Sequence, residues 1–290
     1  MITALVAEVG PLWHERHQAV LTARPRRRAV GAGAKYKLVL VDRLLATLVH
    51  LHHGATPDVQ ACWFGVDRST ITRANSEVRP LLAQRGCTVT PDIRLGSLAE
   101  VIEPLGANGP TGIIDGTEIR GRRPATGRKD RVKFISGKNK QNAVKYMVVT
   151  DAEGRLPFCS PAEPASCADI THARKLGLAK LLAEGPAVEI LADAGYQGFG
   201  AQTGGRVVTP PHRKFKKNPP EWYEEMHERQ RKARSSRRIR VQHGIGRHLK
   251  NWRALAHHHG RREHMSDIIQ AVAGLLSHQQ TATIASSVRM

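Results

Sequence analysis

Two aspartates at the ends of short apolar runs are the residues of this chain best placed to do chemistry. Asp115 follows two isoleucines, and Asp193 follows the largely aliphatic run at 188–192. Such runs are typical of buried strands, and the glycine within two residues of each aspartate permits a tight turn. Two carboxylates that are fixed and converge can hold a hard cation such as Mg²⁺. The chemistry that this pair supports is metal-assisted attack on a phosphodiester.

The chain is strongly basic, and its positive charge is concentrated. Its 290 residues include 45 Lys and Arg against 25 Asp and Glu, a formal charge of +20. Residues 211–262 alone hold 16 Lys and Arg and 4 Glu. This clustering favours a polyanionic partner, most simply nucleic acid, over a protein that is basic by chance. An apolar fraction of 40% with 4% aromatic residues is compatible with a core built mainly from Val, Leu, Ile and Ala.

Cysteine usage and hydropathy indicate the cellular setting. The four cysteines are Cys62, Cys87, Cys159 and Cys167, and none forms a Cys-x-x-Cys pair. Since no secretory signal is evident, we expect reduced thiols in a cytoplasmic protein. No apolar run approaches the roughly 20 residues that span a bilayer, so we expect no membrane association. His257–His259 is interpreted as a solvated polar run, because three consecutive residues cannot share one helix face.

Residues 37–85 have the pattern of three short helices. In the first, apolar residues recur every three or four positions. Thr56 and Pro57 are suited to the start of a second helix. Gly65 then allows a turn, and Asp67 can cap a third helix. A short helix, a glycine turn and a further helix form a helix-turn-helix pattern.

The third helix of this region has the composition of a helix that enters the major groove of DNA. It is rich in Arg, Ser, Thr and Asn, and the side chains expected to face outward are Arg68, Ser69, Thr72 and Arg73. The alternative is an ordinary three-helix cap on the next domain.

The remaining regions give the domain organisation. We expect a basic arm or linker at 1–36, a helix-turn-helix domain at 37–85, a linker at 86–108, an α/β domain at 109–280 and a tail at 281–290. Strands are predicted at 113–114, 132–135, 143–149, 156–159, 188–193 and 206–209, with helices at about 169–183, 220–234, 236–256 and 265–279. This order of elements predicts an α/β layered fold.

Several motifs in this order resemble the DDE-superfamily transposases of bacterial insertion sequences. They are Ile114–Thr117, Ser136–Lys140, Leu191–Gly198, Thr209-Pro210, Ser236–Val241 and Leu249–Arg253. The resemblance covers about residues 37–280. It implies a ribonuclease-H-like mixed sheet with flanking helices, preceded by a small all-α helix-turn-helix domain.

The resemblance also implies a chemistry and partners. Asp115 and Asp193 would be the first and second acids that hold Mg²⁺ or Mn²⁺. The reaction would be DNA strand cleavage followed by strand transfer, on double-stranded DNA that includes terminal inverted repeats and a target. A homo-oligomer on DNA and a bacterial, nucleoid-associated location in the cytoplasm are expected.

The chain departs from the family where the third acid is expected. Gln242 stands where the family carries glutamate, and the stretch after it is one residue longer than the usual form. A glutamine offers a neutral carbonyl oxygen and no charge to offset a cation. The departure therefore predicts an impaired third catalytic position. Rescue by an acid of the preceding helix is an alternative, from Glu221, Glu224, Glu225 or Glu228.

Further residues are assigned weaker roles. Phosphate contacts are predicted for Lys138, Lys140, Arg237, Arg238, Arg240 and Lys250, and Lys145 is considered with the first two, against the alternative of a solvated hairpin tip. Asp169 is interpreted as a helix N-cap in preference to a third metal ligand. For Tyr196 and Trp252, packing is preferred to contact with DNA bases.

Three hypotheses follow from these observations. The first is a DNA transposase with metal-dependent endonuclease activity. The second, supported by Gln242, is a catalytically inactive DNA-binding derivative. The third is a basic ribonucleoprotein component, which would have no metal dependence and no preference for a DNA terminus.

Overall fold

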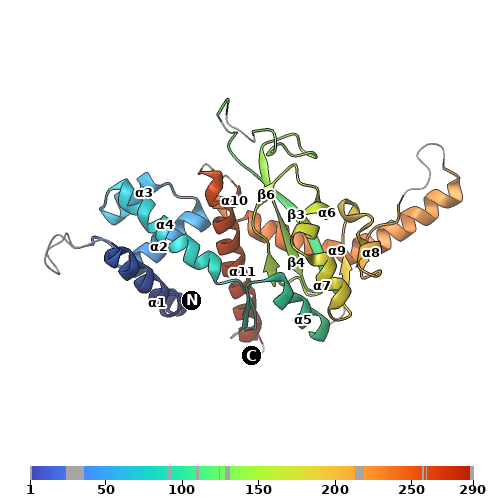
Figure 1. The fold of residues 1–290 in the computed structure, drawn as a ribbon, viewed down its shortest axis with the longest axis horizontal. Coiled ribbons are helices and arrows are strands. Elements are labelled where there is room, and N and C mark those ends of the chain that lie inside the picture. Colours follow the sequence, from blue (N-terminus) through green and yellow to red (C-terminus); the bar gives the residue numbers. More distant parts are fainter. Residues whose placement is uncertain are drawn as a thin grey trace.

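The structure, a computed structural model, describes residues 2–23, 36–90, 93–108, 111–123, 125–127, 131–212, 219–256, 258 and 260–287. Within these ranges it describes the backbone alone at residues 90, 104, 107–108, 234–248 and 283–287. Figure 1 shows a helical lobe at one end of the molecule, a sheet covered by helices at the other, and helix α11 between them.

The helical lobe contains the predicted helix-turn-helix. Its helices are α1 (Ile2–Thr22), α2 (Leu40–His53), α3 (Pro57–Phe64) and α4 (Arg68–Gln84). The Thr56 hydroxyl accepts a hydrogen bond from the amide of Val59 at 3.4 Å and so caps α3. Gly65 ends α3 with a positive φ of 60°, a conformation that glycine adopts without strain. Asp67 occupies the N-cap position of α4, but its side chain makes no cap hydrogen bond.

Two regions that the sequence assigns to connecting segments contain regular structure. Helix α1 lies where we predicted a basic arm, and Leu5 and Val9 on it are fully buried. The predicted linker at 86–108 holds strands β1 (Cys87–Thr90) and β2 (Ile93–Leu95), which form an antiparallel hairpin, and helix α5 (Leu98–Asn108). Of the glycines and prolines that suggested a linker, Gly86 precedes β1 and Gly96 lies between β2 and α5, whereas Pro104 and Gly106 lie within α5.

The main sheet is mixed and has the strand order β5-β4-β3-β7-β8. Its strands are β3 (Thr111–Arg120), β4 (Ala143–Thr150), β5 (Phe158–Cys159), β7 (Glu189–Leu191) and β8 (Val207–Val208), and β6 (Glu163–Pro164) pairs with β4. Strands β3, β4 and β5 are antiparallel, whereas β7 and β8 run parallel to β3. This is the ribonuclease-H-like arrangement that the resemblance implies, so the predicted fold class is confirmed.

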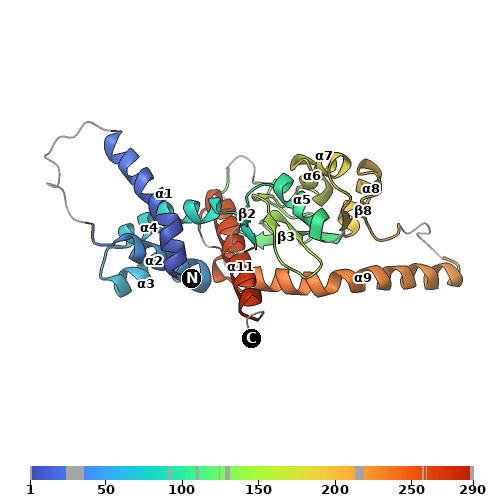
Figure 2. The ribbon, with the colours of Figure 1, turned by 90° about the horizontal axis from the view of Figure 1, so that it is seen from below.

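Helices cover both faces of the sheet. One face packs against α5, α6 (Asp169–Lys175), α7 (Leu178–Glu184), the 3₁₀ turn η1 (Ala194–Tyr196) and α8 (Phe199–Gln202). The other packs against the C-terminal helices α9 (Glu221–Lys250), α10 (Arg253–Ala256) and α11 (Met265–Ser287), with the 3₁₀ turn η2 (Arg262–His264) before α11. Figure 2 shows α9 running along the sheet and continuing beyond it.

Several predicted elements differ from those observed. Residues 131–134 form turns and only Ile135 makes an isolated bridge, because the amide of Ile135 bonds to the carbonyl of Val132 instead of a neighbouring strand. The helix predicted at 169–183 is split into α6 and α7 by Gly177, which has a φ of 75°. The helices predicted at 220–234 and 236–256 are largely one, α9, because the serines at 235 and 236 do not interrupt it.

Helix α11 joins the two ends of the molecule. It contacts α4 of the helical lobe, strand β1 and strand β5 of the sheet. Helix α11 can approach the residue before β1 closely because Gly274 has no side chain. A β-carbon at Gly274 would lie only 2.6 Å from the carbonyl oxygen of Gly86. The Ser277 hydroxyl accepts a hydrogen bond from the amide of Thr88 at 2.8 Å. No helix in the described part of the chain is both long and apolar enough to cross a membrane.

Candidate active site

Asp115 lies in the middle of β3 and not at a strand end as the sequence suggested, whereas Asp193 lies two residues beyond the end of the neighbouring parallel strand β7. In the pairing of β3 with β7, Ile113 is opposite Leu191, and each aspartate comes two residues later. Asp193 continues β7 in an extended conformation, with φ −84° and ψ −177°. Because side chains alternate between faces along a strand, both aspartates project from the face that carries Ile113 and Leu191. Adjacent strands are about 4.8 Å apart, so this register allows the two side chains to approach each other.

The face that carries the two aspartates is the one covered by the C-terminal helices. Ile113 and Leu191 belong to the same buried cluster as Leu249 at the end of α9 and Trp252. Tyr146 on β4 is also in this cluster and is fully buried. Burial raises the pKa of Tyr146, and the neighbouring Cys159 and Asp115 raise this pKa further. Asp115 therefore acts electrostatically on the interior of this face.

Asp193 is oriented by the turn that follows it. Its Oδ1 accepts a hydrogen bond from the amide of Gly195 at 2.9 Å, and this caps η1. Gly195 itself lies between two carboxylates: a β-carbon there would be 3.0 Å from Oδ1 of Asp193 and 2.7 Å from Oδ2 of Asp169. The absence of a side chain at residue 195 lets Asp169 approach the turn that holds Asp193.

Asp169 is not the N-cap that the sequence suggested. Helix α6 begins at Asp169, and its N-cap is Ala168. The Asp169 carboxylate lies beneath β3, where a β-carbon at Gly116 would be 2.3 Å from its Oδ1. Gly116 and Asp115 are adjacent in β3, so their faces of the sheet are opposite. Asp169 thus lies on the opposite face of β3 from Asp115 and close to the turn that holds Asp193.

Lys145 holds Asp169 in place and does not lie at a hairpin tip. Its Nζ is 3.0 Å from Oδ1 of Asp169 and 3.8 Å from Oε1 of Glu118, and it donates a hydrogen bond to the carbonyl oxygen of Cys167 at 2.9 Å. Lys145 is buried in β4. Because Lys145 is buried and its charge is already compensated by acidic side chains, it is not placed to contact a phosphate at the surface.

Glu118 extends this network to the loop before β4. It accepts hydrogen bonds from the Ser136 hydroxyl at 2.9 Å and from the Asn139 side-chain amide at 3.0 Å. The Ser136 hydroxyl accepts in turn from the amides of Lys138 and Asn139. Lys138 and Lys140 are exposed on this loop, so the network fixes the backbone that presents both lysines.

We expect Gly116→Ala to lower the free energy of unfolding by about 1–3 kcal/mol, the usual cost of forcing an extra carbon into a packed site. The new methyl group would collide with Asp169, which Lys145 prevents from moving away. The measurement is urea unfolding followed by circular dichroism.

Gly137→Ala is the matched control, because a β-carbon at Gly137 has no atom within 4 Å. We expect it to change stability by no more than about 0.5 kcal/mol. Equal stabilities of the two variants would show that Asp169 does not pack against β3 as described.

The third expected catalytic residue, Gln242, is described by its backbone alone. Gln242, Arg237, Arg238 and Arg240 lie within α9, but their side chains are outside the described residues. The backbone nevertheless decides one alternative. Glu228 precedes residue 242 by 14 positions on the same helix, about 21 Å at 1.5 Å per residue. The structure therefore argues against rescue of residue 242 by Glu228 or by the acids before it.

The predicted DNA-contacting side chains of the helical lobe are accessible. Arg68, Ser69, Thr72 and Arg73 are all exposed on α4, whereas Ile71 and Ala74 are fully buried beneath them. Lys250, the last residue of α9, is also exposed. By contrast, Tyr196 and Trp252 are buried, which agrees with the packing roles preferred for them.

The donor set of the two aspartates fits a hard divalent cation. Asp115 and Asp193 contribute carboxylate oxygens from one face, which is the ligand type that Mg²⁺ and Mn²⁺ prefer. Among the described residues no group of three His, Cys, Asp or Glu side chains is arranged to hold a metal. The two aspartates are the described side chains that would hold such a cation.

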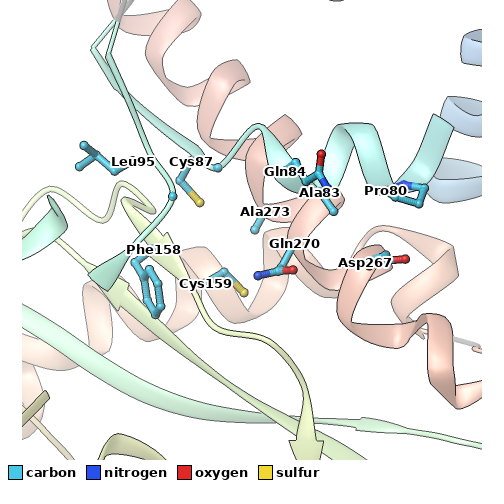
Figure 3. A pocket seen from close by; sticks show the side chains of 12 residues that line it. Pro80, Ala83, Gln84, Cys87, Leu95, Phe158, Cys159, Asp267, Gln270 and Ala273 are labelled. Atoms are coloured by element: carbon cyan, nitrogen blue, oxygen red, sulfur yellow. The ribbon is translucent and has the colours of Figure 1, made fainter. Parts of the chain in front are cut away.

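A cavity of about 320 Å³ lies at the junction of α4, β1, β5 and α11. Figure 3 shows Cys87 and Cys159 beside it, with Gln270 of α11 close by. Burial raises the pKa of Cys87 to about 12 and raises that of Cys159 as well. Both thiols therefore stay protonated near neutral pH, which makes them poor nucleophiles. All four cysteines are free, as the sequence predicts.

The fold and the two carboxylates define a class: a ribonuclease-H-like protein with an acidic site of the kind that carries out metal-assisted phosphodiester chemistry. A family model described as "DDE superfamily endonuclease" matches residues 114–277, and one described as "Helix-turn-helix of DDE superfamily endonuclease" matches residues 36–88. The first match covers more than half of the chain. The chain belongs to the DDE superfamily endonucleases, the group that includes the transposases it resembles.

The solved structures that the chain matches include transposase complexes. "Mos1 transposase paired-end complex with left transposon end" is 11% identical, with a TM-score of 0.22, and the match covers 94% of this chain and 86% of that chain. "Crystal structure of a pre-cleavage Mos1 transpososome" is 12% identical, with a TM-score of 0.23 and the same coverage. "Crystal structure of the Mos1 mariner paired end complex with Mn" is 11% identical, with a TM-score of 0.22, covering 84% of this chain and 85% of that chain. No curated protein matches the chain.

Proposed function

We propose that this protein is a DNA transposase that cleaves phosphodiesters at the ends of a mobile element and joins the freed ends to target DNA. The observation that carries the proposal is the equivalent register of Asp115 in β3 and Asp193 after the parallel strand β7. The helix-turn-helix lobe would bind the terminal inverted repeats, with Arg68, Ser69, Thr72 and Arg73 toward the DNA.

In the proposed reaction a water attacks the phosphorus of a terminal phosphodiester, and the bond to the 3′-oxygen breaks. The 3′-hydroxyl that is released then attacks a target phosphodiester and displaces the 3′-oxygen there. A divalent cation, held by Asp115 and Asp193, would supply Lewis-acid polarisation of the phosphoryl oxygens. The residues of the chain position this centre: the Gly195 amide fixes Asp193, and Lys145 with Asp169 supports β3 and η1.

The basic residues outside the site would hold the DNA. Lys138, Lys140 and Lys250 are exposed, and Arg237, Arg238 and Arg240 belong to the same basic helix as Lys250. Phosphate contacts of this kind orient the duplex and do not read its sequence. Because two element ends must be brought together, we also propose that the protein works as a homo-oligomer on DNA.

A second candidate function is supported by Gln242. With an uncharged amide at the third position, the protein would be a catalytically inactive DNA-binding derivative that occupies element ends. The two candidates differ in metal dependence, because only the transposase needs the two aspartates for its function.

The test is cleavage of a duplex that carries the inverted repeats flanking the gene, in Mg²⁺ and in Mn²⁺. Cleavage by the wild-type protein that is lost in Asp115→Asn supports the transposase. Binding of the repeat without cleavage by the wild type, with cleavage restored in Gln242→Glu, supports the inactive derivative. An absence of any preference for the repeat over other duplexes would overturn both.

A further inference from the structure

A cavity of about 700 Å³ lies where the helix-turn-helix lobe meets the segment that follows α9. The end of α2 and the start of α3 form one wall, the face of α4 forms the second, and the stretch from α10 to η2 forms the third. Its volume is in the range of ligand-binding sites. Figure 1 shows α10 beside the helical lobe, at one end of α11. The cavity is therefore shared by the two modules.

Direct packing fixes these walls relative to each other. A β-carbon at Gly54, which ends α2, would lie 3.0 Å from Cβ of Arg253 at the start of α10. The rings of His52 and Trp252 make an edge-to-face contact with centroids 5.0 Å apart. Trp252 is buried. The walls of the cavity are thus held in place by side-chain packing between α2 and the segment that contains Trp252 and Arg253.

The lining is cationic. Six of the lining side chains are basic or can become so, three arginines and three histidines: His50, Arg68, Arg79, His258, Arg261 and His264. Asp58 is the one carboxylate among the described lining residues, and it lies 3.6 Å from Arg68 with both side chains largely exposed. An exposed ion pair of this kind is weak, so the cavity keeps a positive potential.

The titration behaviour of the histidines reflects this crowding. Burial lowers the pKa of His258, and positive charge at His50 and Arg79 lowers it further. Burial also lowers the pKa of His264, and Arg79 adds to this effect. Like charges near a histidine disfavour its protonated form, so the basic side chains around His258 and His264 repel one another when they are charged. An anion between them would relieve their mutual repulsion.

The Arg79 guanidinium, at the floor of the cavity, has a hydrogen-bond donor that no described residue accepts. Its side chain is only 8% exposed, and its nearest acid is Asp267, at 3.7 Å from Nε. Among the described residues Nε has no hydrogen-bond partner. Burial lowers the pKa of Arg79, and the charge of Asp267 partly offsets this. A buried guanidinium with an unsatisfied donor is costly unless a ligand completes it.

The cavity continues the surface of α4 that the proposed function assigns to DNA. Arg68, Thr72, Ser76 and Arg79 line it, and their spacing of four, four and three residues places them on one face of the helix. The Thr72 and Ser76 hydroxyls donate to the carbonyl oxygens four residues earlier. The face therefore presents cations at both ends, with Arg68 near the start of α4 and Arg79 deeper inside.

We propose that this cavity binds backbone phosphates of the DNA duplex that α4 contacts, so that one DNA strand is held jointly by the helix-turn-helix lobe and by the Gly260–His264 segment beside α11. The inference rests on the proposed DNA-binding function and deepens it. Arg261, exposed at the rim, would meet a phosphate first. Since α11 packs on both α4 and the sheet, a contact here would place the bound duplex relative to the catalytic strands.

The test measures binding of the full-length protein to a fluorescent duplex of about 30 base pairs by anisotropy, over roughly 50 to 200 mM salt. Loss of one phosphate contact should reduce the slope of log affinity against log salt by about 0.9. We expect this reduction, with a several-fold loss of affinity, for Arg261→Gln, and about twice the change for Arg261→Glu. Lys180→Gln is the matched control, because Lys180 is 77% exposed on α7 and its loss changes the net charge equally.

The outcomes separate this inference from the proposed function. If Arg261→Gln and Lys180→Gln have the same slope as the wild type while the wild type binds DNA tightly, the cavity does not contact phosphate and only the inference fails. If the wild type does not bind duplex DNA, the proposed function fails with it. A reduced slope for Arg261→Gln alone supports the inference.

Discussion

Replacing Gln242 with glutamate should raise metal-dependent cleavage of a terminal-repeat duplex by about 10²-fold or more. The family to which the chain belongs carries glutamate at this position, and an amide cannot neutralise a cation as a carboxylate does. A full negative charge at a divalent cation contributes several kcal/mol, and roughly 1.4 kcal/mol corresponds to a tenfold change in rate. The measurement is the initial rate of strand cleavage on a denaturing gel.

Gln230→Glu is the control for this prediction. Gln230 is exposed on the same helix, and twelve residues separate it from position 242, about 18 Å along the axis. It adds the same charge without placing it beside Asp115 and Asp193. Similar rates for the two variants would mean that residue 242 is not part of the catalytic centre.

Asp115→Asn in the Gln242→Glu background is expected to lower the cleavage rate by about 10³-fold. The substitution keeps the shape of the side chain and removes its charge. Asp115 stands in the middle of β3, opposite Val148 of β4, so the backbone around it should be unaffected. The rate is measured on the same substrate, with the unfolding midpoint recorded to confirm that the variant is folded.

Glu184→Gln controls for loss of a carboxylate elsewhere. Glu184 is at the exposed end of α7, where it pairs with Lys180 at 4.0 Å. We expect its cleavage rate to match that of the parent. A parent-like rate for Asp115→Asn would remove the basis for assigning catalysis to Asp115 and Asp193.

The sequence was sufficient to predict features with a strong local signal. The apolar runs before Asp115 and Asp193 indicated two strands, and Thr56 and Gly65 marked the boundaries of α3. The resemblance then supplied the order of the strands, which local patterns do not contain. The ribonuclease-H-like sheet and the helix-turn-helix were therefore predictable.

Features that depend on long-range packing were not predictable. Nothing in the residues around Asp169 indicates that its carboxylate lies beneath Gly116 and beside Gly195, since these contacts join positions far apart in the chain. The burial of Lys145 follows from the same contacts. Residues 131–135 contain apolar side chains suited to a strand, yet hydrogen bonds in the turn determine their conformation.

The cavity beside α10 illustrates the same limit. His50, Arg79 and Arg261 come from three separate regions of the sequence and meet only because α10 packs on α2. Charge counting located a basic segment at 211–262 but did not show that its last residues face α4.

The most direct test of the account is a Mn²⁺ titration of the full-length protein, followed by electron paramagnetic resonance. We expect Asp115→Asn and Asp193→Asn each to weaken Mn²⁺ binding by at least about tenfold, since each removes one of two charged oxygen ligands. Glu184→Gln should bind as the wild type does. Wild-type affinity for Mn²⁺ in both aspartate variants would contradict the claim that Asp115 on β3 and Asp193 after β7 form a metal site.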